Sequence, residues 1–356
     1  MIINFWQNIL SIHQIPFLEE LSCIPNIKIN LIVSNVDGTE REKMGWETEI
    51  SNSINLKCIS DINLLDYIDI SDVNIFSGFF VYKDLNKAFS LCKNKNKNKK
   101  IFIYSEGKDD IGLKGYLRLF KDFLLWRVNG APNIKFLAIG DKGVEWFKKV
   151  GVSDRQIIKF GYFTKNYFNS NLFESEFNRK VIFVGRLLPS KGIVELVNAF
   201  KDERLNEFTL DIYGNGLLEE DINLFINENK LSNRVKRYDF VANNIMREKI
   251  FNYDVLVLPN TGDEGWGAVV NEALQSGLKV ICSVKTGSSC LIKSSGAGVI
   301  LNSINNETLV EALLRVETLK MSRKYIFDWS QNNISPKVAA DKFISIINGK
   351  DDRFDW

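Results

Sequence analysis

The sequence predicts an α/β protein of two domains, each built around a parallel β-sheet. Short apolar segments alternate with stretches of helical periodicity, a pattern typical of parallel strands joined by helices. The pattern begins again near residue 180. A chain of 356 residues is also too long for one ordinary hydrophobic core, so we expect two domains of comparable size.

Apolar segments on either side of a polar stretch define the predicted strands. They are residues 3–7, 29–34, 73–78, 100–105 and 134–140, followed by 180–185, 208–214, 255–260 and 279–283. Residues 161–179 are polar and rich in Asn and Ser, as expected of an interdomain linker. We therefore predict an N-terminal domain over 1–163, a C-terminal domain over 164–335, and a C-terminal helix and tail over 336–356 that could pack back on the N-domain.

Composition and charge exclude several classes of protein. A net charge of +2 argues against a general nucleic-acid binder, which needs a strongly basic domain. The five cysteines include no CxxC pair, so neither a disulfide framework nor a zinc site is expected. The apolar N-terminus lacks a basic leader and is interpreted as a strand, and no apolar run is long enough to span a bilayer. We expect a cytoplasmic protein whose membrane contact, if any, is peripheral.

Two basic segments stand out in the N-terminal half. Residues 93–100, KNKNKNKK, are interpreted as a solvated loop. Residues 114–128 predict an amphipathic basic helix, which could lie at a membrane interface or pack on its own sheet. Its apolar stripe consists of Leu117, Phe120, Leu124 and Val128, with Lys114, Arg118 and Lys121 nearby.

Two cations follow the first strand of the second set. The strand ends at Gly185, and a helix is expected to begin near residues 189–190. Arg186 and Lys191 lie in or beside the turn between them. Either residue alone could be an ordinary surface charge. Together, at the carboxyl end of a strand and beside the positive N-terminus of a helix, they predict a diphosphate site.

Two carboxylates follow the third strand of that set. Glycines disfavour helix over residues 262–267, so Glu264 is expected in a turn and Glu272 in the helix that follows. Glu264 can point toward sugar hydroxyls, and Glu272 can accept two hydrogen bonds from a ribose diol. The backbone amides that open the helix could hold a phosphate or a sugar without a metal ion. These amides belong to Gly265, Trp266, Gly267, Ala268 and Val269.

These segments resemble a known family. GRLLPSKG at residues 185–192, YGNG at 213–216, and the glutamates at 264 and 272 are similar to motifs of the retaining glycosyltransferases of family 4, or group 1 glycosyltransferases, of the bacterial surface-polysaccharide type. The resemblance covers roughly residues 180–300, whereas the N-terminal half matches only in strand order. It implies the GT-B fold, in which two Rossmann-like domains with parallel sheets face each other across a cleft.

The resemblance implies a role for each motif residue. Arg186 and Lys191 would bind the donor diphosphate beside Gly185, Glu264 would contact the transferred sugar, and Glu272 would bind the ribose. The sequence has no DxD motif, so we expect no metal and no cofactor, with protein cations stabilising the departing nucleotide. Retention could proceed through a covalent carboxylate intermediate or by same-face attack, and the resemblance favours the second.

Three further residues could frame the nucleobase of the donor. Gly214, Phe240 and Val241 follow two strands of the C-terminal half, although a GxG segment is more often a plain tight turn. Trp266 departs from the family, where phenylalanine is common at this position, and the indole could reshape the sugar pocket.

Candidate acceptor residues come from the N-terminal half. His13 follows the first strand and Glu106 follows the fourth, so both are expected at the carboxyl edge of the sheet. Glu106 could orient an acceptor hydroxyl or act as a weak base. The first loop lacks the glycine pair that often lets it approach the donor phosphates in the family.

The expected activity is transfer of a sugar from a UDP- or GDP-linked donor to a saccharide acceptor, lipid-linked, in O-antigen or capsule synthesis at the cytoplasmic face of the inner membrane. Two alternatives remain open. A sugar-nucleotide epimerase or hydrolase of the same fold would need acid and base groups that a chain with one histidine supplies poorly. A nucleotide-sugar binding protein without turnover would need none. A dehydrogenase is disfavoured because no GxGxxG follows the first strand.

Overall fold

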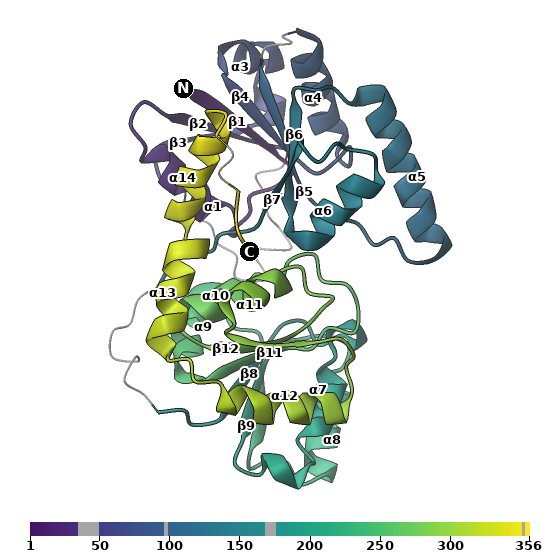
Figure 1. The fold of residues 1–356 in the computed structure, drawn as a ribbon, viewed down its shortest axis with the longest axis vertical. Coiled ribbons are helices and arrows are strands. Elements are labelled where there is room, and N and C mark those ends of the chain that lie inside the picture. Colours follow the sequence, from purple (N-terminus) through teal and green to yellow (C-terminus); the bar gives the residue numbers. More distant parts are fainter. Residues whose placement is uncertain (35–49, 96–98, 168–175, 351–352) are drawn as a thin grey trace. The chain divides into compact units, whose positions relative to one another are not determined.

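The computed structural model describes residues 1–34, 50–95, 99–167, 176–350 and 353–356 (Figure 1). These residues divide into two compact units. Unit 1 comprises Met1–Lys165 and Pro336–Phe354, and unit 2 comprises Asn166–Ser335 and Asp355–Trp356. Parts of the predicted linker and of the basic segment at 93–100 fall outside the described residues.

Unit 1 contains a seven-stranded sheet in the order β3-β2-β1-β4-β5-β6-β7, and every pairing is parallel. The strands are β1 (Ile2–Gln7), β2 (Lys28–Val33), β3 (Ile54–Cys58), β4 (Val73–Ser77), β5 (Lys100–Glu106), β6 (Ile134–Ile139) and β7 (Ile157–Phe160). The helices are α1 (Ile15–Ser22), α3 (Leu64–Ile70), α4 (Lys83–Lys95), α5 (Gly112–Asn129), α6 (Gly140–Lys149) and α14 (Pro336–Ile347).

Unit 2 contains a six-stranded parallel sheet in the order β10-β9-β8-β11-β12-β13. The strands are β8 (Lys180–Val184), β9 (Thr209–Tyr213), β10 (Val235–Tyr238), β11 (Val255–Leu258), β12 (Lys279–Ser283) and β13 (Gly298–Leu301). The helices are α7 (Ile193–Ala199), α8 (Glu219–Glu228), α9 (Asn243–Lys249), α10 (Val269–Gln275), α11 (Ser289–Ser295), α12 (Asn306–Thr318) and α13 (Arg323–Ile334).

The prediction of two Rossmann-like parallel sheets is confirmed, and every predicted strand is present. The strands that the sequence did not reveal are β3, β7, β10 and β13, which are the two edges of each sheet. Most positions of the interior strands are apolar, as in β1 and β11, whereas the edge strand β10 reads VKRY. The facing of the two domains across a cleft stays a prediction.

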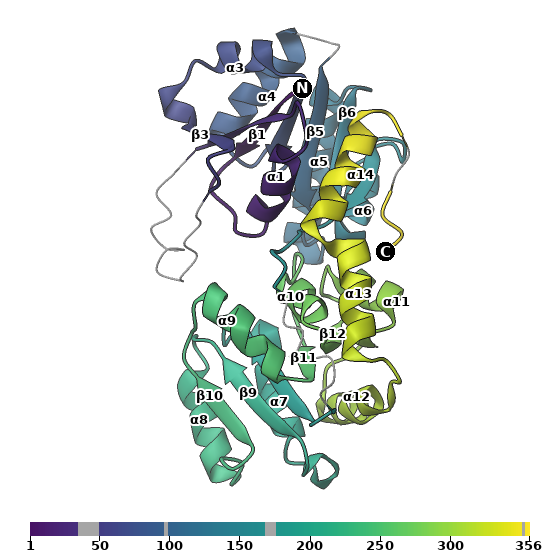
Figure 2. The ribbon, with the colours of Figure 1, turned by 90° about the vertical axis from the view of Figure 1, so that its left-hand side faces the viewer.

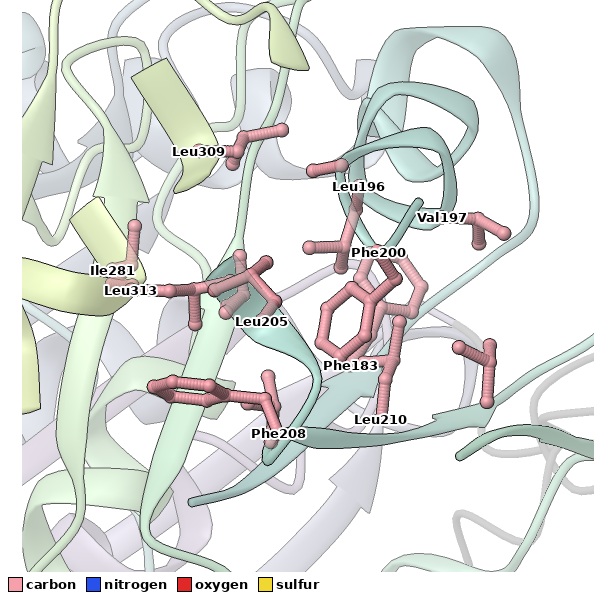
Figure 3. Close-up of a cluster of buried hydrophobic side chains, with 14 of the residues drawn as sticks. Phe183, Leu196, Val197, Phe200, Leu205, Phe208, Leu210, Ile281, Leu309 and Leu313 are labelled. Carbon is pink, nitrogen blue, oxygen red and sulfur yellow. The ribbon is translucent and has the colours of Figure 1, made fainter. Parts of the chain in front are cut away.

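Each unit has its own apolar core. In unit 2, side chains of α7, β8, β9 and α12 meet around Phe183, Phe200 and Phe208 (Figure 3). In unit 1, the C-terminal helix α14 packs beside α1 (Figure 2). Phe343 of α14 contacts Phe17 of α1, with ring centroids 5.6 Å apart. The last long helix of the chain therefore completes the core of the first unit.

A ladder of asparagines crosses four strands of unit 1, and it is buried at Asn4, Asn30 and Asn74 and exposed at Asn55. Asn55, Asn30, Asn4 and Asn74 occupy register-matched positions on β3, β2, β1 and β4. Asn55 donates to Asn30 at 2.8 Å, Asn30 to Asn4 at 2.8 Å, and Asn4 to Asn74 at 3.3 Å. The ladder satisfies the buried amides and favours a single register for these four strands.

The orientation of α5 corrects one interpretation of the sequence. Its predicted apolar stripe does not pack on the sheet, because Leu117, Phe120, Leu124 and Val128 are 48–76% exposed. The buried face instead carries Gly115, Asp122 and Trp126. Asp122 accepts hydrogen bonds from Lys108 at 2.7 Å and from the indole of Trp146 at 3.1 Å. The polar contacts of Asp122 thus lie on the packed face of α5, and the apolar stripe is exposed. The helix α5 lies at the right-hand margin of unit 1 in Figure 1.

Two turns at the carboxyl ends of neighbouring strands are joined in unit 2. The carbonyl oxygen of Ser190, in the turn after β8, accepts hydrogen bonds from the amides of Thr261 and Gly262 after β11, both at 3.0 Å. Gly192 has a φ of +67°, and a Cβ there would lie 1.9 Å from the carbonyl oxygen of Pro259. Glycine at 192 is therefore required for this close approach.

Replacing Gly192 with alanine should destabilise the protein more than replacing Gly112. Both glycines have almost the same φ, +67° and +68°, but a Cβ at Gly112 would meet no atom within 4 Å. Both variants carry the cost of positive φ, and only Gly192→Ala adds a steric clash, which we expect to cost a further ~1–3 kcal/mol, the scale of overpacking. Urea unfolding measures the difference, and equal losses in the two variants would contradict the assigned contact.

Candidate functional site

The predicted donor residues of unit 2 gather where its strand order reverses. β8 pairs with β9 on one side and with β11 on the other. The chain runs from β8 to β9 and β10, and then crosses back to β11. In open parallel sheets the loops at such a switch point diverge, and ligands bind outside the carboxyl ends of the strands. Arg186 and Lys191 follow β8, and Glu264 follows β11.

Lys191 and Glu264 form an ion pair that links these two loops. The ammonium group of Lys191 contacts Oε2 of Glu264, and the two side chains are 18% and 23% exposed. Asn260, almost fully buried, donates to the same oxygen at 3.3 Å and to Oγ1 of Thr286 at 3.4 Å. The carboxylate of Glu264 is therefore held from two sides while remaining open to solvent.

Arg186 differs from Lys191 in having no partner among the residues that the structure describes. Its side chain is exposed, and over the described ranges its guanidinium makes no ion pair or hydrogen bond. It follows β8 directly after Gly185, so it lies in the same loop as Lys191. An unpaired guanidinium with five donors can bind a phosphate in a bidentate manner.

The loop that carries Glu264 is held against the end of β12. The amide of Glu264 donates to the carbonyl of Lys285 at 3.1 Å, and the ammonium of Lys285 donates to the carbonyl of Thr261 at 2.5 Å. A Cβ at Gly287 would lie 2.0 Å from the carbonyl oxygen of Gly265. Lys285 is thus a further cation near the predicted sugar position, which the sequence reasoning missed.

The amides predicted to open α10 include several that form no hydrogen bond with the described residues. Those of Gly265, Gly267 and Ala268 donate to no protein group in the part of the chain that the structure describes. α10 has seven residues and begins at Val269. The side chain of Trp266 is buried, and its indole donates to Asn271 at 2.8 Å. Any contact of this residue with a donor would therefore come from its backbone.

Glu272 lies on α10, a helix that is buried throughout residues 270–275. Glu272 itself is 5% exposed. Oε1 accepts a hydrogen bond from Asn243 of α9 at 3.2 Å and lies 3.8 Å from a guanidinium nitrogen of Arg247. Burial lowers the pKa of Arg247, and the carboxylate of Glu272 acts against this shift. The sequence reasoning placed Glu272 correctly on this helix and missed both α9 partners.

The residues predicted to frame a nucleobase follow β9 and β10. A Cβ at Gly214 would lie 1.9 Å from the carbonyl oxygen of Gly185, so the loops after β8 and β9 touch. Phe240 is 44% exposed, and its amide donates to Asn215 at 2.6 Å. Val241 is half-buried. An exposed ring at the carboxyl edge of the sheet is suited to stacking on a base.

The two acceptor candidates of unit 1 share a neighbour, Tyr162. Its ring centroid lies 5.9 Å from that of His13. Burial raises the pKa of Tyr162 well above its usual value, and Glu106 raises it further by its charge and by a hydrogen bond between the two side chains. The structure therefore brings His13 and Glu106 into one polar cluster. Tyr162 was missed because it lies in the linker segment, where no periodicity marks it.

The described residues contain no group of three or more His, Cys, Asp or Glu side chains arranged to hold a metal ion. The expectation that the chemistry proceeds without a metal stays a prediction.

Residues 165–333 match the family described as glycosyl transferases group 1. A curated relative, the uncharacterized glycosyltransferase MJ1178 of Methanocaldococcus jannaschii, is 27% identical over 57% of this chain and 61% of the relative. The match thus spans less than two thirds of that relative's length.

Solved structures with low sequence identity share the fold. The apo lipopolysaccharide outer core galactosyltransferase WaaB has a TM-score of 0.71 at 18% identity, covering 98% of this chain and 99% of WaaB. HepE of Anabaena, solved in complex with UDP, has a TM-score of 0.72 at 14% identity, covering 98% and 100%. These similarities confirm the predicted GT-B class, and the family match confirms a glycosyltransferase domain in the C-terminal half. Residues 165–333, which carry Arg186, Lys191, Glu264 and Glu272, form a domain of the glycosyl transferases group 1 family.

Proposed function

We propose that the chain is a retaining glycosyltransferase that moves a sugar from a UDP- or GDP-linked donor to a saccharide acceptor. The observation that carries the proposal is the cationic pair after β8, where Arg186 is exposed and Lys191 contacts the carboxylate after β11. The group 1 family match over the same residues and the relatives named as glycosyltransferases support it.

Arg186 and Lys191 would stabilise the leaving group. Cleavage of the bond between sugar and phosphate leaves a nucleoside diphosphate with growing negative charge. In many enzymes, fixed cations directed at such a charge make the largest contribution to stabilising the transition state. They need no reorganisation during the reaction. In this proposal the two protein cations do what a divalent ion does in other transferases.

Glu264 would bind the transferred sugar and would not attack it. Its carboxylate already accepts from Lys191 and Asn260 at one oxygen. When the donor diphosphate draws Lys191 away, Glu264 can accept hydrogen bonds from sugar hydroxyls. Retention then follows from same-face attack, in which an oxygen of the departing phosphate takes the proton of the acceptor hydroxyl, so no protein nucleophile is needed.

The cluster of His13, Tyr162 and Glu106 would bind the acceptor hydroxyl in unit 1. The carboxylate of Glu106, which already forms a hydrogen bond with Tyr162, would accept a further one from the acceptor hydroxyl, and the ring of Tyr162 would pack on the sugar ring. We infer that the acceptor is a lipid-linked saccharide, as in the synthesis of an O-antigen or capsule at the cytoplasmic face of the inner membrane.

Removal of either cation should reduce turnover without unfolding the protein. We expect Arg186→Ala and Lys191→Ala each to lower kcat by about 10-fold to 1,000-fold, the scale for loss of one charge-stabilising donor. Arg315→Ala is the matched control, because Arg315 is an exposed arginine of the same unit that lies on α12. A panel of UDP- and GDP-sugars, screened by thermal stabilisation, first identifies the donor. Near-normal kcat in both variants would refute the assigned role.

We further propose that α5 rests on an anionic membrane. Its outward side chains include Leu113, Tyr116, Leu117, Phe120, Leu124 and Val128, each between 48% and 76% exposed. Single exposed apolar residues are common, but a continuous apolar face along one helix marks an interaction surface. No described helix is long and apolar enough to cross a bilayer.

The charges around this face favour lipid over an apolar protein partner. Every exposed charged side chain of α5 is basic, since its one acidic residue, Asp122, is buried. A cavity of about 460 Å³ at the C-terminal end of α5 is lined in part by Arg127 and Arg155. Basic side chains beside an apolar helix face attract anionic headgroups, and aromatic rings suit the interface. Binding of α5 to the membrane would bring the protein to an acceptor that is anchored there by its lipid.

Charge reversal on α5 should abolish binding to vesicles. The triple variant Lys114→Glu, Arg118→Glu, Lys121→Glu is expected to lose at least about 100-fold in affinity for phosphatidylglycerol vesicles, at roughly 1 kcal/mol for each of the three cations. A second triple variant, with glutamate at Lys57, Lys83 and Lys87, makes the same charge change on exposed lysines elsewhere in unit 1. Sedimentation with vesicles measures both, and unchanged binding of the α5 variant would remove this part of the proposal.

A further inference from the structure

Glu272, the carboxylate proposed to bind the ribose of the donor, is buried together with a guanidinium group. Glu272 is 5% exposed, and Arg247, with which it forms an ion pair, is 2% exposed. Burying a carboxylate or a guanidinium alone is costly, and the cost is recovered only when the charges are paired and hydrogen-bonded. The free-energy cost of burying the carboxylate of Glu272 is therefore offset by the side chains of α9 that contact it.

One face of α9 supplies both partners. Asn243 and Arg247 are four residues apart, so they project from the same side of the helix. The amide of Asn243 donates to Oε1 of Glu272 at 3.2 Å, and Nη1 of Arg247 lies 3.8 Å from the same oxygen. Both interactions therefore converge on a single oxygen of the carboxylate.

Arg247 is itself held in place by groups other than Glu272. Nη2 donates to the side chain of Gln275 at 3.0 Å, three residues further along α10. The guanidinium also lies over the ring of Tyr167, 4.9 Å from its centroid. A planar cation fixed by a hydrogen bond and by ring stacking loses little freedom when it orients a carboxylate.

The second oxygen of Glu272 is left for a ligand. Within the described ranges, no donor forms a hydrogen bond to Oε2. A carboxylate has about four lone-pair positions, so Oε2 and the remaining position on Oε1 can accept the two hydroxyls of a ribose. The α9 side chains fix Glu272 in the rotamer that leaves Oε2 available to the ribose hydroxyls.

We propose that Arg247 and Asn243 are positioning residues that hold the carboxylate of Glu272 in one rotamer for the ribose of the donor nucleotide. The inference rests on the proposed function, because it assigns the ribose to Glu272. In this proposal the two α9 side chains act through Glu272 and make no contact with the sugar that is transferred. Their removal should therefore weaken nucleotide binding and raise KM, with kcat changed by less than about threefold.

The test compares nucleotides with and without the ribose hydroxyls. Calorimetry measures the affinity of the full chain for UDP and for 2′,3′-dideoxy-UDP, or for the GDP pair if GDP binds instead. We expect the wild-type protein to favour the natural nucleotide by about 100-fold, since each of the two hydrogen bonds to a charged group contributes about tenfold. The ratio should fall below about tenfold in Arg247→Met and to an intermediate value in Asn243→Ala. The ratio of the affinities for the natural and the dideoxy nucleotide should be higher in Arg247→Lys than in Arg247→Met.

Arg323→Met is the matched control. Arg323 is also an arginine whose pKa is lowered by burial, and it pairs with a buried carboxylate, Asp254, at 3.4 Å. That pair lies at the amino end of β11, away from the predicted ribose position. Arg323→Met should lower the melting temperature and leave the ratio unchanged.

The outcomes separate the inference from the proposed function. If Arg247→Met is folded and keeps the full ratio, the inference is wrong while the proposed function stands. If Arg247→Met does not fold, Asn243→Ala decides, because Asn243 is only half-buried. A wild-type protein that binds neither UDP nor GDP would overturn both.

Discussion

The candidate donor site depends on the junction between the turns after β8 and β11. One carbonyl, that of Ser190, accepts from two successive amides of the other turn, and the lack of a side chain at Gly192 lets the backbones touch. This contact fixes the distance between two loops whose strands, β8 and β11, are far apart in the sequence and adjacent in the sheet. The ion pair of Lys191 and Glu264 forms across the same junction. Charge and geometry at the site thus follow from a backbone approach that glycine permits.

The ion pair distinguishes the two cations of the site from each other. Lys191 is neutralised by Glu264, whereas Arg186 stays exposed and unpaired in the part of the chain described. A diphosphate carries more negative charge than one carboxylate and would compete for Lys191. Release of Glu264 would then coincide with arrival of the donor. Binding of the phosphates and exposure of the sugar-binding carboxylate would be coupled through a single lysine.

The sequence predicted the interior of both sheets and failed at their edges. Interior strands are covered on both faces, so most of their positions are apolar, whereas the edge strands β3 and β10 carry exposed polar or charged residues. The orientation of α5 was also beyond the sequence. Periodicity located its apolar stripe, but only the buried contacts of Asp122 show that the opposite face is the one that packs. Helical periodicity gives a face and does not say what covers it.

The candidate site divides in the same way. Arg186, Lys191, Glu264 and Glu272 were predicted because glycines and strand ends mark their loops. Asn243, Arg247 and Tyr162 were not, since each reaches its partner from a segment with no motif of its own. Residues that support a site through tertiary contacts leave no local pattern, and their partners become visible only when the chain is folded.

The central claim is that protein cations, and no divalent ion, hold the donor diphosphate at this junction. A crystal structure of the protein grown with UDP in the presence of EDTA tests it most directly. We expect full occupancy of UDP, with Arg186 and Lys191 within hydrogen-bond distance of the diphosphate and Lys191 released from Glu264. A diphosphate that binds only when a divalent metal is supplied, or that lies away from both side chains, would contradict the claim.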